Sequence, residues 1–555
     1  MNLLKPVSAR LTFCSSLLLL MLAIQASATR RERLIDAWRP TNFNISITLD
    51  DRLTEITKAR TEITAVSLKE NLTVVDLDFG ELTVDGVWLD GKTAQFERTP
   101  GLLNVHLQNP LTKGRRFLVA VEYHGKPKDG LILTNDQDGK PSATGDNWPD
   151  RVHHWIPSLD HPAAKATVTF TVTAPNRDLV VANGKLDHSL TESPNTNTWT
   201  YVEKVPIPAY CMVIAVGEYA TSGPGTPAIT PLTYYVPQSN ASRAVQGFTA
   251  AAPSLKFFSE TIAPYPYEKL ALIVGATRFG GMENSSAIVF AANLLTRRGG
   301  PPNLSRAFNV DAGLERVVAH EIAHQWFGDS VTESTWSDLW LSEGFATYFA
   351  GLVIEKYDGA EAFHEYMDEA AAGYFAYARR KRIPIHDTET EKLFDLLNAN
   401  NYQKGAWVLH MLRSRLGDQA FFRGLRAYYN AHKESTANSD DLRLALEKAS
   451  GKDLKEFFAH WVFGTGHPQY EWGWSSAALA RGGANLRITL KQTQADQLFF
   501  DPVTIEVTSG VAKRRFVIQP SGKVTQADFR LESAPTAVTL DPDGTLLKEV
   551  IALNK

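Results

Sequence analysis

The feature that most constrains this sequence is a His-Glu-x-x-His pentapeptide set in an apolar segment. On an α-helix, residues four apart lie on one face, so the imidazoles of His320 and His324 can reach a single ion. Glu321 points about 100° away around the helix, close to that ion without being a ligand. Burying two histidines and a glutamate without a partner is unfavourable. The sequence therefore predicts a fold built around a metal-binding helix.

A second acidic residue in an apolar segment supplies a candidate third ligand. Glu343 lies in the run Trp-Leu-Ser-Glu-Gly-Phe-Ala, inside another predicted helix. Catalytic zinc commonly takes three protein ligands and keeps a fourth position for water, and two histidines with one glutamate form such a set. We predict one Zn²⁺ per chain, bound by His320, His324 and Glu343. The ligand types alone leave cobalt and manganese open.

The pattern of polar and apolar residues changes twice and indicates a multidomain α+β protein. Alternation between about residues 38 and 235, with Asp-Gly and Asn-Gly turn signals, is typical of an antiparallel β domain with one buried face. Helical periodicity then dominates to about residue 463. Alternation returns afterwards, and we interpret the last segment as a small β sandwich. The predicted boundaries are 1–28 for a signal peptide, 29–237 for the N-terminal β domain, 238–465 for the metal-binding catalytic domain and 466–555 for the C-terminal β sandwich.

Capping signals predict three helices around the candidate metal site. Each of them is expected to end before a glycine. They run from the N-cap Asp311 through Phe327, from about Asp338 to Lys356, and from about Tyr402 to Leu416.

The first 28 residues have the pattern of a secretory signal peptide. Lys5 and Arg10 precede an apolar run over residues 11–24, and Ala-Ser-Ala follows at residues 26–28. This run is shorter than the roughly 20 residues that span a bilayer. We therefore predict cleavage after Ala28, export to the periplasm or the extracellular space, and no stable membrane span afterwards. Retention of the segment as an anchor is the alternative.

Composition limits the chemistry further. The formal net charge is −4 and no long basic run occurs, so nucleic acid is not an expected partner. The chain has two cysteines, and Cys14 leaves with the signal peptide. Cys211 is then alone, cannot form an internal disulfide, and is predicted to be a buried thiol because its neighbours are apolar.

Two motifs together resemble a known family. Eighteen residues separate His324 from Glu343, and Gly-Gly-Met-Glu-Asn stands upstream at residues 280–284. This order is similar to that of the gluzincin aminopeptidases of the M1 family, which include aminopeptidase N and leukotriene A4 hydrolase. The resemblance covers most of residues 35–465. It implies a thermolysin-like, mostly helical catalytic domain and a zinc aminopeptidase acting on peptides with a free N-terminus.

The resemblance also implies roles for single residues. Glu283 would bind the α-amino group of the substrate, and Glu321 would act as the general base on metal-bound water. Tyr402, in a Tyr-x-Lys-Gly context, would stabilise the tetrahedral intermediate. The glycines would let an extended substrate pair with the backbone as an added strand. The implied substrate-binding segment comprises Gly280, Gly281, Met282, Glu283 and Asn284.

The sequence departs from the family in the first domain. Many members carry a second amine-binding acid or Gln shortly before a Pro-Cys-Phe-Asp-Glu-Pro-like segment, which reads Trp-Ile-Pro-Ser-Leu-Asp-His-Pro at residues 155–162 here. Counting back places Trp148 near the expected acid. Asp146, Asn147 or Asp150 could substitute through a shifted loop, so the second anchor stays unassigned.

Two further departures concern substrate range. Larger members have a long helical C-terminal domain over the active site, whereas this chain is predicted to be a short form without it. We therefore expect a more open cleft that accepts longer peptides. Leukotriene A4 hydrolase uses a second Tyr five residues before the oxyanion Tyr, and Leu397 stands there in this chain. Epoxide hydrolysis is therefore not expected.

Two other functions remain open on the sequence. A zinc endopeptidase could share the metal ligands, but it needs no amine anchor such as Glu283. A non-catalytic peptide-binding protein could keep the fold, but the loss of a ligand or of the base would be its expected mark. The oligomeric state and the preferred N-terminal residue are not predicted.

Overall fold

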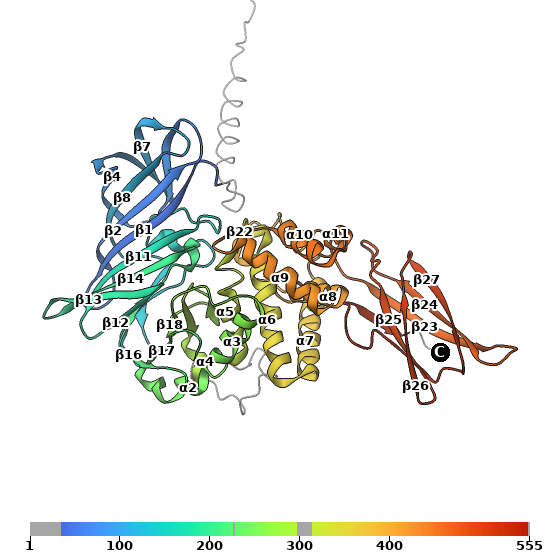
Figure 1. The fold of residues 1–555 in the computed structure, drawn as a ribbon. Coiled ribbons are helices and arrows are strands. Elements are labelled where there is room, and N and C mark those ends of the chain that lie inside the picture. Colours follow the sequence, from blue (N-terminus) through green and yellow to red (C-terminus); the bar gives the residue numbers. More distant parts are fainter. Residues whose placement is uncertain (1–34, 226–227, 297–313, 553–555) are drawn as a thin grey trace, which may run out of the picture.

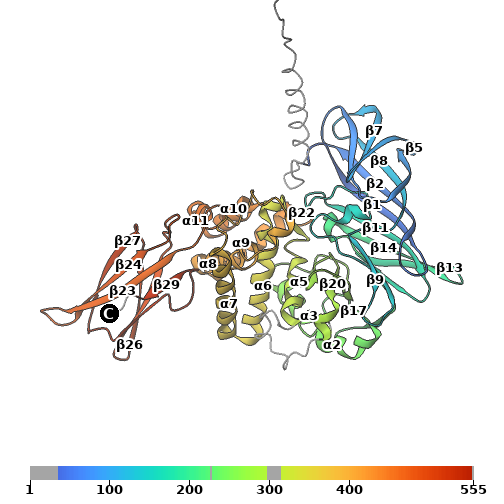
Figure 2. The same ribbon diagram turned by 180° about the vertical axis from the view of Figure 1, so that it is seen from behind.

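The computed structural model describes residues 35–225, 228–296 and 314–552. The molecule is elongated, with β sheets at both ends and helices between them (Figures 1 and 2). The predicted signal peptide and the predicted N-cap Asp311 lie outside the described residues. Within these ranges, every helix is too short or too polar to cross a bilayer.

The N-terminal part is built on an eight-stranded sheet, as the alternating pattern predicts. The burial of β1 alternates along its length, with Phe43, Ile45 and Ile47 in the core. The sheet is not purely antiparallel, because β1 pairs with β11 in parallel. These two strands are far apart in the sequence, and only a hairpin would force opposite directions. In sheet order the strands are β13 (Lys185–Ser193), β14 (Thr196–Ile207), β11 (Ala166–Pro175), β1 (Trp38–Leu49), β2 (Ile56–Ser67), β8 (Arg116–Gly125), β4 (Thr83–Leu89) and β5 (Lys92–Thr93).

Two smaller sheets complete this part. One of them leads from β10 into residues 146–156, the segment that carries Trp148 towards the helical part. Their strands are β12 (Leu179–Ala182), β15 (Ile214–Gly217), β10 (Pro141–Gly145) and β9 (Leu131–Asn135) in the first, and β3 (Leu72–Asp78), β7 (Leu102–Leu111) and β6 (Gln95–Thr99) in the second.

The three predicted helices are present. α5 (Leu314–His324) carries the His-Glu-x-x-His motif, and α6 (Trp340–Asp358) carries Glu343. A short π-helical turn, η9 (Asn400–Lys404), holds Tyr402 and continues into α8 (Gly405–Leu416). The predicted terminating glycines, 328, 359 and 417, all have positive φ angles, a conformation that glycine adopts without strain. α5 ends three residues before the predicted Phe327.

The middle part is less helical than predicted, because it contains a five-stranded sheet. The apolar runs at residues 270–275 and 287–291 form parallel strands that are buried on both faces. Such continuous runs do not alternate, so periodicity alone does not separate them from buried helices. In sheet order the strands are β16 (Tyr219–Ser222), β17 (Leu232–Pro237), β18 (Leu270–Gly275), β20 (Ala287–Ala291) and β19 (Gly281–Met282).

A close crossing of helices brings Tyr402 to the metal-binding residues. A Cβ on Gly344 would lie 2.9 Å from the Cα of Gly405, so two glycines meet where α6 passes η9 and α8. Any side chain there would push the helices apart. The remaining helices and short strands are α2 (Ala244–Gly247), α3 (Ala251–Thr261), α4 (Ala292–Thr296), α7 (Ala360–Ala378), α9 (Asp418–His432), α10 (Ser439–Ser450), α11 (Lys455–Trp461), β21 (Val331–Glu333) and β22 (Ser435–Ala437).

The C-terminal part consists of a four-stranded and a three-stranded sheet. Apolar side chains from both sheets form one small cluster, which includes Ile488 and Ile505. Tyr470, Leu490 and Phe499 instead join the core of the helical part, so the two parts pack against each other. The strands are β27 (Val524–Leu531), β24 (Ala484–Gln492), β23 (Gln469–Ala478) and β29 (Glu549–Ala552) in the first sheet, and β26 (Ala512–Ile518), β25 (Val503–Ser509) and β28 (Ala537–Leu540) in the second.

A buried basic side chain, that of Lys165, connects the N-terminal part to the helical part. The Lys165 ammonium donates to the carbonyls of Asp329 and Ser330, both at 2.7 Å, and to the Thr332 hydroxyl at 3.0 Å. A fourth acceptor is the carbonyl of Ser435 at 3.3 Å. These contacts fix the turn that follows α5.

Candidate active site

A cavity of about 340 Å³ lies between β19, α5, α6 and η9. Its size suits a ligand of about two amino-acid residues. Asn284 does not line it: this side chain is buried behind β19, where its amide donates to the carbonyl of Met282. All the other predicted site residues line the cavity, namely Gly280, Gly281, Met282, Glu283, His320, Glu321, His324, Glu343 and Tyr402.

The three predicted ligands converge on one point. The Nε2 atoms of His320 and His324 are 3.1 Å apart. Oε2 of Glu343 lies 3.2 Å from the first and 3.4 Å from the second. They are the only group of three or more potential metal-ligating side chains in the described part of the chain. Two imidazoles and a carboxylate facing one another this closely fit a divalent cation such as Zn²⁺.

The surroundings of His324 support the same conclusion. Its Nδ1 lies 3.2 Å from the carbonyl of Phe327, an obligate acceptor, and 3.0 Å from the Ser342 hydroxyl. A proton on Nδ1 leaves a lone pair on Nε2, directed at the convergence point. Burial lowers the pKa of His324, but Glu343 raises it above its usual range, and burial raises the pKa of Glu343, but His324 holds it below its usual range.

Glu321 lies against Gly281 of β19 and is 6% exposed. A Cβ on Gly281 would overlap its carboxylate, so this glycine makes room for the glutamate. A Cβ on Gly280 would meet only a methyl group of Val317, at 3.9 Å. Burial raises the pKa of Glu321 well above its usual range; Glu283 and Glu343 reinforce the shift and His324 opposes it.

Glu283 places a second buried carboxylate in the same cavity. It is 6% exposed, and burial raises its pKa to about 7. Within the described ranges, no lysine, arginine or hydroxyl group pairs with this carboxylate, and His324, a predicted metal ligand, opposes the rise of its pKa. A buried acid without a partner is destabilising, so its presence here indicates that a ligand supplies the positive charge.

Tyr402 lines the cavity beside His320. Its ring stacks on that of His320, with 5.9 Å between the centroids and 3° between the planes. Burial and the neighbouring Glu343 raise the pKa of its hydroxyl well above the usual range. The hydroxyl therefore remains a hydrogen-bond donor at any physiological pH.

Two family models match this chain. The peptidase family M1 domain matches residues 247–461, and the peptidase M1 N-terminal domain matches residues 39–211. Together they cover most of the sheets of the N-terminal part and the whole metal site. The chain belongs to peptidase family M1.

Several named relatives of this M1 chain are aminopeptidases. The probable aminopeptidase 2 of Sulfurisphaera tokodaii is 28% identical over 403 residues, which are 71% of this chain and 50% of the relative. Aminopeptidase M1 of Arabidopsis thaliana is 28% identical over 412 residues, which are 73% and 43%. The tricorn protease-interacting factor F2 of Thermoplasma acidophilum is 25% identical over 467 residues, which are 81% and 56%. The chain thus spans about half the length of the curated relatives it matches.

Sequence reasoning about the M1 site missed Gln325. Its amide nitrogen donates to the carbonyl of Glu283 at 2.7 Å and to Asp329 at 2.8 Å, while its oxygen accepts from the backbone of Ser286 at 2.8 Å. Gln325 thereby fastens the segment around Glu283 to the end of α5. A polar residue directly after His324, in an otherwise apolar run, was the available signal.

Counting along the sequence places Trp148, an aromatic residue, near the expected second amine anchor. Trp148 lines the cavity, whereas Asp146, Asn147 and Asp150 do not. Asp146 accepts from Arg151 at 2.9 Å and from Thr277 at 3.0 Å. The Asn147 oxygen accepts from Trp155 at 2.8 Å, and its amide donates to Met212. Of the substitutes left open by the sequence, Asp146 and Asn147 are thus engaged elsewhere.

Proposed function

We propose that this M1 protein is a zinc-dependent aminopeptidase that removes the N-terminal residue from peptides with a free amine. The observation that carries the proposal is the Glu283 carboxylate, buried and without a lysine or arginine partner in the described part, in the same cavity as His320, His324 and Glu343. An ammonium group held at Glu283 would place the first peptide bond of the substrate at the ligand triad in the same cavity, so that a single residue would be released.

The residues of the site divide the chemistry. His320, His324 and Glu343 would hold one Zn²⁺, which when bound polarises a carbonyl and lowers the pKa of a water molecule. Glu321 accepts a proton at its carboxylate as water attacks the scissile carbon, and then delivers this proton to the nitrogen of the departing peptide. The Tyr402 hydroxyl donates to the carbonyl oxygen as negative charge develops there.

The backbone of β19 supports the binding of an extended peptide. This strand lies at the edge of the five-stranded sheet, bonded only to β20. An open edge can accept a further strand through main-chain hydrogen bonds. Gly280 and Gly281 keep this edge free of side chains beside the cavity. A substrate paired there would lie along the metal-binding residues with its amine near Glu283.

The proposal is tested by identifying the products of a free pentapeptide by mass spectrometry, with zinc-loaded protein and with protein treated with a chelator. We expect release of the first residue alone, loss of activity on chelation and recovery with Zn²⁺. Internal cleavage would instead indicate an endopeptidase. Binding without cleavage by the zinc-loaded protein would indicate a non-catalytic peptide-binding protein.

We further propose that the protein is exported and that residues 466–555 form a small β sandwich. The motif at residues 1–28 supports export, and the apolar cluster shared by the two C-terminal sheets supports the sandwich. N-terminal sequencing of protein from the periplasm or the medium should give Thr29 as the first residue. A start at Met1 in the membrane fraction would indicate a retained anchor.

A further inference from the structure

One end of the cavity is a wall of aromatic and aliphatic side chains. Trp148, 2% exposed, makes edge-on contacts with Phe279 and Phe394, both with 6.0 Å between ring centroids. Trp336 contacts it from behind at 5.7 Å. Leu397 extends the same apolar lining of the cavity. These rings hold one another, so the wall is a preformed surface.

The charged groups near this wall are already paired with each other. Arg151 donates to Asp129 at 2.8 Å and to Asp146 at 2.9 Å. Arg278 also donates to Asp129, at 2.8 Å. Glu283 is consequently the one carboxylate at this end that lines the cavity, among the described residues. A second positive charge on a substrate would find no counterpart here.

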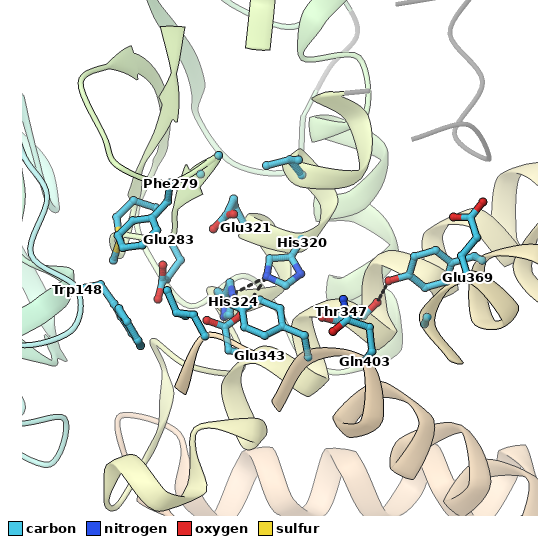
Figure 3. A pocket seen from close by; sticks show the side chains of 18 residues that line it. Trp148, Phe279, Glu283, His320, Glu321, His324, Glu343, Thr347, Glu369 and Gln403 are labelled. Carbon is cyan, nitrogen blue, oxygen red and sulfur yellow. Dashed lines mark hydrogen bonds and ion pairs between the residues drawn. The ribbon is translucent and has the colours of Figure 1, made fainter. Parts of the chain in front are cut away.

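The position of the wall relative to Glu283 decides what it contacts. Figure 3 shows Trp148, Phe279 and Glu283 on one side of the metal-binding residues, with Gln403 and Glu369 on the other. If the substrate amine lies at Glu283 and the scissile carbonyl at the metal-binding residues, the α-carbon lies between them. The side chain of the first residue then faces the Trp148 end, and the departing peptide extends towards Gln403.

We propose that Trp148, Phe279 and Leu397 form the pocket for the side chain of the N-terminal residue and select large apolar residues, such as Phe and Leu. This inference rests on the proposed aminopeptidase activity. In this arrangement the amine is held by Glu283 alone, and Trp148 contributes apolar surface where a second acid would contribute charge. Burial of additional methylene groups in such a pocket raises kcat/KM by about 10- to 200-fold. Small residues leave the wall in contact with water, and Lys or Arg brings a charge that it cannot pair.

The test compares matched free tetrapeptides that differ only in the first residue, Phe, Leu, Ala or Lys. We expect kcat/KM for Phe and Leu to exceed that for Ala by about 10- to 100-fold, and Lys to fall below Leu. Trp148→Ala should reduce the Phe-to-Ala ratio at least about tenfold, and Trp148→Phe should keep most of it. Because Trp148 is buried, Phe279→Ala on the less buried part of the wall gives an independent reading. Trp88→Ala, a tryptophan of the N-terminal part outside the cavity, is the matched control and should keep the wild-type ratio.

A wild-type enzyme that treats Phe, Leu and Ala alike, that prefers Lys, or whose Phe-to-Ala ratio survives both Trp148→Ala and Phe279→Ala would overturn the proposal. Calorimetric binding of leucinamide and alaninamide to zinc-loaded protein separates this result from failure of the proposed function. If no peptide is cleaved, the aminopeptidase proposal fails. The pocket proposal then stands only if leucinamide binds at least about tenfold more tightly and Trp148→Ala removes the difference.

Discussion

Buried charges are treated differently in two neighbouring regions of this molecule. Lys165 has four acceptors in the helical part, and Arg151 has two carboxylates within the N-terminal part. In the cavity, Glu283 and Glu321 are as deeply buried but have no lysine or arginine partner in the described residues, and His324, a predicted metal ligand, opposes the rise of their pKa values. A buried charge with a partner fixes the local structure, whereas an unpaired buried charge that faces a cavity can bind a ligand or transfer a proton. Variants of the cavity residues should therefore lose activity, whereas variants of the paired residues should lose stability.

The largest effect is expected for Glu321→Gln. Because the amide cannot accept the proton of the attacking water, kcat should fall by about 10³- to 10⁴-fold. Removal of an unpaired buried acid should leave the melting temperature unchanged or higher. Peptide hydrolysis and a thermal melt of the same zinc-loaded sample measure both. Glu315→Gln, on the same helix, is the control and should keep the wild-type kcat and melting temperature. A Glu321→Gln variant as active as the wild type would show that Glu321 is not the general base.

A smaller loss is expected for Gly281→Ala. Its methyl group would overlap the Glu321 carboxylate and displace it. A displacement of about 1 Å can lower kcat by about 100-fold. The methyl group of Gly280→Ala meets only Val317, at an ordinary contact distance, so this variant should lower kcat by less than tenfold. Equal losses in these two variants would show that the glycines act through the backbone rather than by making room for Glu321.

In the interface, Lys165→Met should affect stability more than activity. Several carbonyls lose their donor, and each buried polar group left without a partner costs about 1–3 kcal/mol. We expect unfolding free energy to fall by about 2–4 kcal/mol in denaturant titrations, while kcat/KM at low temperature changes less than tenfold. Lys140→Met, at an exposed site, is the matched control. A Lys165 variant with wild-type stability and a large loss of kcat would contradict the distinction between the regions.

Glu333 lies outside the cavity, and its raised pKa makes the stability of the protein depend on pH. Both of its carboxylate oxygens are buried without a hydrogen-bond partner in the described structure, and burial raises its pKa to about 8. Between about pH 4.5 and 8 the unfolded state releases this proton while the folded state keeps it, so stability decreases as pH rises. Glu333→Gln should therefore stabilise the protein at pH 8, on the order of 2 kcal/mol, and much less at pH 4.5, with little change in activity. Denaturant titrations at both pH values that give the same difference would show that Glu333 does not hold a proton.

Local patterns predicted the elements that carry the chemistry. The ligand triad follows from residues four apart on α5 and an acid in an apolar helix, and Gly328, Gly359 and Gly417 lie where helices end. The buried strands β18 and β20 were not predicted, because a continuous apolar run fits a helix equally well. The contacts of Gly281 with Glu321, and of Gly344 with Gly405, depend on how distant segments pack, which periodicity does not encode. The same holds for Trp148, whose place in the cavity depends on the path of the loop after β10.

The central claim is that Glu283 is left unpaired for the ammonium group of the substrate. The most direct test measures kcat/KM of wild type and Glu283→Gln for one peptide with a free and with an acetylated N-terminus. Because removing one partner of a buried charge pair costs several kcal/mol, we predict that acetylation lowers kcat/KM of the wild type by at least about 100-fold and that of Glu283→Gln by less than tenfold. Equal cleavage of both peptides by the wild type, or undiminished discrimination by Glu283→Gln, would contradict the account.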